Sequence, residues 1–194
     1  MKKSALLAIL TIASCLLNAN VAFDIGFFNP KDSKVGILWG LEYFVEIDER
    51  ISICFTGNYY TREYIESSRV DEQKYETERT ARFLPFLAGF KVNIPIEGSP
   101  VTPFAGADIG YGFAWERTRV TLVGGEESES GKGKNYNGFT WRINLGATYP
   151  LGQMSELYVK ALYNGAGYDR NEKIGKSKFD MSGMSAGVGI KFKF

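Results

Sequence analysis

The sequence predicts an all-β fold: an eight-stranded antiparallel up-and-down transmembrane β-barrel that follows an N-terminal signal peptide. Three observations support this prediction. Apolar and polar residues alternate with a period of two in segment after segment. The connections between these segments alternate between short and long, and no apolar run after the N-terminus is long enough for a membrane-spanning helix.

The N-terminus has the features of an export signal. Lys2 and Lys3 form a positively charged start, and residues 5–17 form an apolar stretch that is short for a membrane-spanning helix. Small residues follow at Ala19 and Ala22, so we expect cleavage after Ala19 or Ala22.

This assignment divides the chain into a signal peptide over residues 1–22 and a barrel domain over residues 23–194. An alternative is lipidation of Cys15, since residues 12–15 resemble a lipoprotein cleavage box. Two leucines would then begin the mature chain, where lipoproteins usually carry a polar tether.

Eight segments show the alternation and are expected to form strands. Most of them reach the length that a tilted strand needs to cross a bilayer. The pattern is clear at the C-terminus, where Ile190 and Phe192 share one face and Lys191 lies on the other, and residues 139–149 show the same alternation. The expected strands are residues 23–28, 35–45, 51–59, 84–94, 105–115, 139–149, 157–163 and 184–194.

Short and long connections alternate between these strands. The short turns are expected at residues 47–50, 95–100 and 150–154. The long polar loops are expected at residues 29–33, 67–75, 124–136 and 169–176. Transmembrane barrels of the outer-membrane type have short periplasmic turns and longer extracellular loops. This order of connections places both chain ends on the periplasmic side, which requires an even number of strands.

The apolar faces are expected to point outward into lipid. They carry Trp and Tyr near strand ends, as interfacial girdles do. The opposite faces carry too many charges for a solvent-free protein core. The orientation is testable in coordinates, because Ile143 and Val159 should then be exposed while Arg142 and Lys160 are enclosed.

The enclosed faces predict a polar lumen filled by paired side chains. A barrel of eight strands has an interior just wide enough for side chains to fill it, so we expect no open pore. A polar network of Glu42, Asp108, Arg142, Lys160 and Lys91 is expected at its centre. The full inward set is expected to be Glu42, Glu46, Asn58, Arg82, Lys91, Asp108, Glu116, Arg142, Lys160, Asn164, Lys191 and Lys193.

The last strand carries a resemblance to a known group of proteins. The segment MSAGVGIKFKF resembles the C-terminal assembly signal of bacterial outer-membrane barrels, with Gly187, Ile190, Phe192 and the terminal Phe194 in the matching positions. The segment VTPFAGADIGYGFAW is similar to a strand of the small OmpA-like and OmpX-like barrels of the porin family. The resemblance implies a monomer in the bacterial cell outer membrane, delivered by periplasmic chaperones and inserted by the barrel-assembly machinery.

The inventory of side chains argues against catalysis and against cofactors. The chain has no His, and Cys54 is the lone cysteine after the signal region, so neither a metal cluster nor a disulfide framework is expected. Glu42 and Glu46 lie too far apart on one strand for paired acid–base work. The glycines at residues 130–133 miss the phosphate-loop spacing. With 23 basic and 22 acidic residues, no charge excess points to nucleic acid.

The function expected from these features is a structural or surface-interaction role through extracellular loops. The segments 63–80 and 124–136 are the main candidates for partner contact, because function on such scaffolds lies in loops. The alternatives are a small-solute or ion pore, a soluble lipocalin-like carrier with its apolar face inside, and an enzyme acting on lipid.

Overall fold

The computed structural model describes residues 19–70, 73–122, 128–130, 133–171 and 176–193. Cys15 and the terminal Phe194 lie outside these residues. Among the described residues the chain forms only strands. They are β1 Ala19–Pro30, β2 Gly36–Glu46, β3 Ile51–Val70, β4 Gln73–Asn93, β5 Thr102–Leu122, β6 Ser128–Ser130, β7 Lys134–Pro150, β8 Ser155–Gly165, β9 Gly167–Asn171, β10 Lys176–Asp180 and β11 Gly183–Phe192.

Eight of the described strands close into an antiparallel barrel. Their order is β4-β3-β2-β1-β11-β8-β7-β5, and pairing of β4 with β5 completes the ring. The first and last strands meet in register, with Phe23 opposite Ile190. Closure leaves no unpaired sheet edge within the belt, which is the condition for strands to lie in lipid. The predicted fold is therefore confirmed.

The short connections lie together at one end of the barrel. Tight backbone hydrogen bonds close them, from Ile47 N to Ile51 O at 2.9 Å and from Leu151 N to Ser155 O at 2.9 Å. In the turn between β4 and β5, Gly98 has a φ of 76°, a conformation that residues with a side chain rarely adopt. We define this end as periplasmic and the opposite end as extracellular.

Burial settles which face of each strand meets lipid. Ile143 and Val159 are 54% and 53% exposed, whereas Arg142 and Lys160 are 2% and 6% exposed. The apolar residues thus cover the outside of the barrel and the charges lie within it. A soluble carrier with an apolar interior would have the reverse arrangement, so that alternative is wrong.

Among the residues that the structure describes, no helix is long and apolar enough to cross a membrane.

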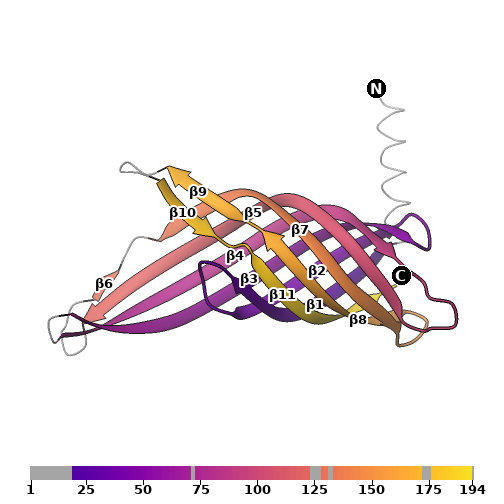
Figure 1. Cartoon of the computed structure of the whole chain (residues 1–194), viewed down its shortest axis with the longest axis horizontal. Helices are drawn as coiled ribbons and strands as arrows, with labels where there is room; N and C mark the ends of the chain where they lie inside the picture. The colour runs from indigo at the N-terminus through magenta and orange to yellow at the C-terminus, as the bar shows by residue number, and fades with distance from the viewer. Residues whose placement is uncertain (1–18, 71–72, 123–127, 131–132, 172–175, 194) are drawn as a thin grey trace, which may run out of the picture.

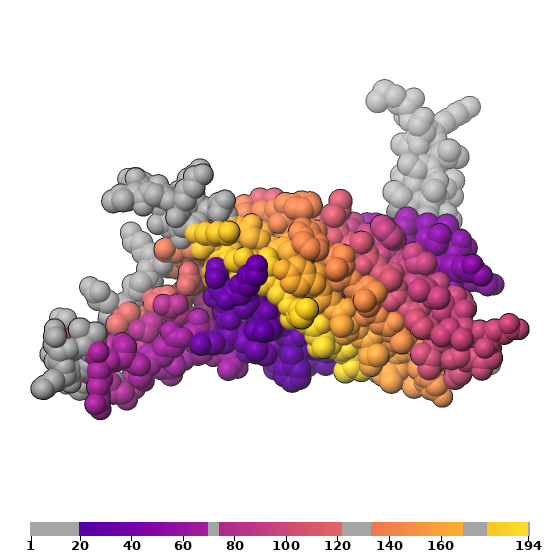
Figure 2. Space-filling model, in the orientation of Figure 1, coloured from indigo at the N-terminus to yellow at the C-terminus, as the bar shows by residue number. Residues whose placement is uncertain are grey.

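Three strands continue far past the apolar belt. β3, β4 and β5 have 20, 21 and 21 residues, whereas β2 and β8 have 11 each. Their extracellular parts, residues 61–70, 73–82 and 115–122, form a sheet that we call the blade, and β6 pairs with the β5 part of it. Figure 1 shows the blade running beyond the other strands, and Figure 2 shows it as the purple and magenta projection of the molecule.

At the extracellular end, the strands continue further than the sequence predicted. The expectation ended one strand at residue 59 and began the next at residue 84, where the outward apolar alternation stops. Backbone pairing nevertheless continues to Val70 opposite Gln73. Cross-strand ion pairs such as Arg119 with Glu78, whose charged atoms are 3.6 Å apart, replace apolar contacts there.

The last long connection forms a hairpin at the extracellular end of the barrel. β9 and β10 pair with each other as a separate two-stranded sheet. This hairpin is seen at the upper left of Figure 1, beyond the extracellular ends of β8 and β11. Tyr168 on β9 and Phe179 on β10 are 1% and 3% exposed, so the hairpin contributes buried aromatic side chains to the barrel.

We predict that the mature protein begins at Asn20, through cleavage after Ala19. The Asn20 side chain donates a hydrogen bond to Glu46 Oε1 at 2.7 Å, and Ala22 is fully buried. Cleavage after Ala22 would remove both contacts from the first strand of the barrel. N-terminal sequencing and the intact mass of the exported protein test this, and a chain that starts at Phe23 would contradict it.

Candidate functional site

The centre of the lumen is organised around the Arg142 guanidinium on β7. Its Nε donates to Asp108 Oδ2 at 2.7 Å. Its two terminal nitrogens donate to Asn58 Oδ1 at 2.7 Å and to Thr56 Oγ1 at 2.9 Å. Glu42 Oε1 lies 4.0 Å from Nη2. One side chain thus joins β7 to β5 and β3 across the interior of the barrel.

Lys160 on β8 forms the second half of the network. Its ammonium donates to Asp24 Oδ2 at 2.8 Å and also to Glu42 Oε1. Tyr158 OH donates to the same Asp24 oxygen at 3.1 Å. Glu42 lies beside both Lys160 and Arg142, so it links the two halves. These pairs satisfy the buried charges, which is necessary in a low-dielectric interior.

Lys91 occupies a different environment from the other predicted members. Its Nζ lies 4.0 Å from the ring centroid of Phe104 and 4.6 Å from that of Phe44. Lys91 is 6% exposed. Such cation–π contacts stabilise a desolvated ammonium. The structure therefore brings Glu42, Asp108, Arg142 and Lys160 together and places Lys91 in an aromatic layer toward the periplasmic end.

The periplasmic opening is crossed by ion pairs. Lys191 Nζ lies 2.8 Å from Glu46 Oε1 and 3.6 Å from Glu156 Oε2. Lys193 pairs with the same Glu156 carboxylate. Lys191 is buried, whereas the Glu46 side chain is 39% exposed. This layer marks the transition from the lumen to solvent.

The extracellular end is closed by an apolar layer that we call the cap. Tyr168 from β9 enters the barrel and hydrogen-bonds the Thr140 hydroxyl. A Cβ at Gly112 would overlap the Tyr168 hydroxyl, so glycine is required at that position. The cap consists of Phe28, Leu38, Tyr60, Ala81, Phe83, Ala114, Tyr136, Ala166, Tyr168, Phe179 and Met181.

Sequence reasoning misplaced one charged residue and missed several lumen residues. Arg82 was expected inside, but it is exposed, since it shares the outward parity of Leu84 and Phe86 on β4. Asp24 was missed, although it alternates with Phe23 and Ile25 and could have been found by that signal.

The aromatic lumen residues are harder to identify from the sequence. Phe44, Phe104 and Tyr158 are each at most 4% exposed, yet they resemble lipid-facing residues in composition. Only the phase of the alternation in each strand, fixed by its charged neighbours, separates them from the outer belt.

The expected assembly-signal residues lie on the strand that closes the barrel. Ile190 and Phe192 are 39% and 40% exposed on the outer face of β11. Gly187 pairs with Gly26 on β1, so a side chain there would press on the β1 backbone.

The described residues offer no group of three or more His, Cys, Asp or Glu side chains that could hold a metal ion. Cys54 is a free, buried thiol in the periplasmic aromatic layer, together with Ala22, Phe44, Phe104 and Tyr158. It packs as a small apolar residue.

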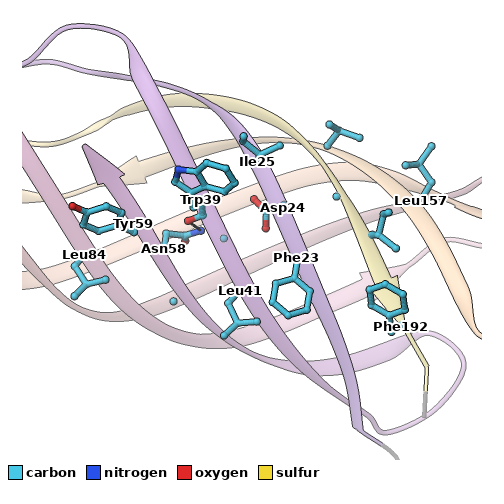
Figure 3. A pocket seen from close by; sticks show the side chains of 15 residues that line it. Phe23, Asp24, Ile25, Trp39, Leu41, Asn58, Tyr59, Leu84, Leu157 and Phe192 are labelled. Atoms are coloured by element: carbon cyan, nitrogen blue, oxygen red, sulfur yellow. Dashed lines mark hydrogen bonds between the residues drawn. The ribbon is translucent and has the colours of Figure 1, made fainter. Parts of the chain in front are cut away.

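A groove of about 760 Å³ lies on the outer surface of the barrel. Figure 3 shows this groove, with Trp39, Leu41 and Phe23 among the side chains that line it. Its lining is almost wholly apolar and belongs to the lipid-facing belt. A groove of this kind accommodates acyl chains and does not form a path through the barrel.

The extracellular segments carry two carboxyls with shifted pKa values. A hydrogen bond with Glu78, and the negative charge of that residue, raise the pKa of the exposed Glu63 on the blade. Partial burial of Asp180 opposes its ionisation. Hydrogen bonds from Ser182, together with the nearby Lys31, outweigh this effect and lower the pKa of Asp180. The nearby negative charge therefore opposes ionisation of Glu63 on the blade.

Comparisons with known proteins identify the architecture. Neisserial surface protein A superposes with a TM-score of 0.56 at 14% identity, covering 91% of this chain and 97% of that one. OprG from Pseudomonas aeruginosa gives 0.55 at 11% identity, covering 91% and 96%. Ail, the attachment invasion locus protein of Yersinia pestis, bound to the heparin analogue sucrose octasulfate, gives 0.52 at 11% identity, covering 91% and 99%.

No protein-family model and no curated protein matches the sequence. At these identities the structural likeness establishes the fold. Together with the lipid-facing belt, it defines the class: the chain is a small eight-stranded transmembrane β-barrel of the bacterial outer-membrane type.

Proposed function

We propose that this chain is a non-enzymatic surface protein of the bacterial outer membrane that acts through contacts of its blade. The observation that carries the proposal is the extension of β3, β4 and β5 past the apolar belt. A bilayer needs only about 9–11 residues of a tilted strand, and these strands have 20 or 21. The additional residues present side chains well beyond the membrane.

The character of the blade favours a protein partner over a uniform polyanion. Its described residues carry both signs in close alternation, as in the Lys74–Glu76 and Glu78–Arg119 pairs. Mixed charges recognise a surface of complementary pattern, whereas a polyanion requires an excess of cations. Attachment and surface exposure appear in the names of Ail and Neisserial surface protein A, and they support a contact role here.

The test removes the β3 and β4 parts of the blade and keeps the barrel. Residues 64–79 are replaced by an Asn-Gly turn between Glu63 and Thr80, which face each other in register. Cells that display the full chain should be retained on immobilised serum proteins more strongly than on immobilised heparin. The shortened chain, at matched surface density and with unchanged heat-modifiable gel mobility, should lose that retention. Equal retention of the two chains would contradict the proposal.

We predict that the full chain does not conduct. The cap, the charged network and the periplasmic ion pairs fill successive layers of the lumen. Planar-bilayer recordings should give no reproducible steps for the wild type. The double variant Phe83→Ala/Tyr168→Ala removes two rings of the cap and should not conduct by itself. Adding Arg142→Ala, which opens the central network, should raise the leakage detectably. Reproducible wild-type conductance would favour the pore alternative.

Export and assembly complete the proposal. The signal peptide over residues 1–22 directs export, and periplasmic chaperones hand the chain to the barrel-assembly machinery. Gly187, Ile190, Phe192 and Phe194 form the signal that this machinery reads. The barrel works as a monomer, since within the belt its sheet has no open edge through which a second copy could pair.

A further inference from the structure

Beyond the barrel mouth, one edge of the blade is left without a neighbouring strand. β2 pairs with β3 only as far as Thr61, whereas β3 and β4 remain paired out to Val70 and Gln73. In the part of the chain that the structure describes, no other strand and no loop backbone pairs with β3 beyond Thr61. The opposite side of the blade differs, because β6 covers β5 over residues 119–121. Residues 62–69 of β3 therefore form an open edge.

The hydrogen bonds of β3 identify which of its backbone groups face this edge. Arg50 O accepts from Asn93 N at 2.7 Å on the β4 side, and Ile51 O accepts from Ile47 N at 2.9 Å on the β2 side. Residues of an antiparallel strand alternate between their two neighbours, so even-numbered residues of β3 bond to β4 and odd-numbered residues face the other way. The register of β3 on β4 is the same along the whole of both strands. The backbone groups at the open edge are therefore those of Glu63, Ile65, Ser67 and Arg69.

Proline, lysine and bulges, which commonly protect a sheet edge, are missing here. Residues 62–69 contain neither proline nor lysine, and the unchanged register leaves no bulge in them. The connection between β1 and β2 reaches this part of β3 through Lys34, whose ammonium lies 3.4 Å from Glu66 Oε1 and 5.7 Å from the ring centroid of Tyr64. Glu66 and Tyr64 have the inward parity of the buried Tyr60. Lys34 thus lies on the inner face and leaves the odd-numbered backbone groups uncovered.

The outer face of the same edge carries an apolar residue that no apolar residue covers on the β4 side. Ile65 is 65% exposed and lies opposite Glu78 on β4. It lies beyond the apolar belt, so lipid does not cover it. Glu63 and Arg69 share this face at the two ends of the open edge. A strand added antiparallel would place its own side chains directly opposite these residues, on the same face.

We propose that an extended segment of the partner protein adds to this edge as an antiparallel strand, an inference that deepens the contact role proposed above and rests on it. A row of alternating N–H donors and C=O acceptors is complemented by another extended main chain. Selectivity comes from the outer face, where an apolar residue opposite Ile65 covers it, with a basic residue opposite Glu63 and an acidic residue opposite Arg69. Two copies of this chain in one membrane stand the same way up. Their β3 strands run in the same direction and cannot form this antiparallel pair.

The first test varies the backbone of the ligand and uses the purified, folded barrel in lipid nanodiscs. The probe is the fluorescein-labelled peptide TETSTITKT, which can place its Glu, Ile and Lys opposite Arg69, Ile65 and Glu63, and which the wild type should bind saturably. N-methylation at its Ser and Ile removes two donors that face the blade and should raise the half-saturating barrel concentration at least about tenfold. N-methylation at the two Thr that flank Ile, the matched control, removes donors that face away and should leave that concentration within about twofold.

The second test removes a donor from the blade. Ser67→Pro deletes an N–H that faces the open edge and keeps the bonds from β3 to β4, so the heat-modifiable gel mobility should not change. Binding of the unmethylated peptide should weaken at least about fivefold, as expected for one lost hydrogen bond. Ser67→Ala removes the side chain, keeps the N–H, and should stay within about twofold of the wild type.

Three results would overturn the inference. The wild type could fail to bind the unmethylated peptide saturably, the two methylated peptides could bind equally, or Ser67→Pro could bind as tightly as Ser67→Ala. Failure of strand addition is distinguishable from failure of the proposed function. If cells that display Ser67→Pro keep full retention on serum proteins while the shortened chain loses it, the blade acts through its side chains alone. The proposed function then stands and strand addition is wrong, whereas retention of the shortened chain contradicts the proposed function itself.

Discussion

Arg142→Met is expected to destabilise the barrel by about 3–5 kcal/mol, because it leaves a carboxylate buried without its partner. Asp108 is 3% exposed and would keep only the hydrogen bond from Asn144 Nδ2, at 3.1 Å. Asn58 and Thr56 would each lose a donor. Urea unfolding of the protein folded in lipid vesicles, followed by tryptophan fluorescence, measures the change.

Two controls separate this effect from a general response to substitution. Arg50→Met removes an exposed arginine in a periplasmic turn and should change the stability by no more than about 0.5 kcal/mol. Adding Asp108→Asn to Arg142→Met removes the stranded charge and should restore a large part of the loss. An unchanged unfolding midpoint for Arg142→Met would show that the network does not stabilise the barrel.

Val159→Arg should cost about 2–4 kcal/mol, since it places a charge on the lipid face near the bilayer midplane. Val159 lies in the middle of β8, is 53% exposed, and is flanked in register by Ala147 and Val188. The same unfolding measurement applies. The cost should fall when the protein is held in detergent micelles, where water reaches the belt more easily.

Ile65→Arg is the matched control for this change. Ile65 is 65% exposed on the same outer face of the sheet, but it lies on the blade opposite Glu78. The substitution there should be nearly neutral, because the site is solvated and an acid is adjacent. Equal costs at Ile65 and Val159 would contradict the placement of the membrane.

The fold was predictable because the alternation of apolar and polar residues recurs in each membrane-spanning strand. A period of two with Ile143 on one side and Arg142 on the other allows only one orientation in lipid, and closure follows from the need to pair every backbone group. The lumen partners were less accessible. Arg142 joins Asn58 over 84 residues of chain, and no local pattern encodes that distance or geometry.

The extracellular parts of the structure were the least predictable, for a different reason. Tyr168 lies in the barrel mouth because the β9–β10 hairpin places it beside Thr140 of β7 and Gly112 leaves room for its hydroxyl. Such a fit depends on three segments at once. The blade was underestimated because the apolar signal that marks a membrane strand ends at Tyr59, while hydrogen bonding between the strands continues to Val70.

Backbone pairing in the blade affects how freely its amino-acid sequence can change. Main-chain hydrogen bonds, which any residue except proline can supply, define its shape from Glu63 to Val70. The exposed side chains of this region can therefore change at little cost to insertion and anchoring, which depend on the belt and the lumen.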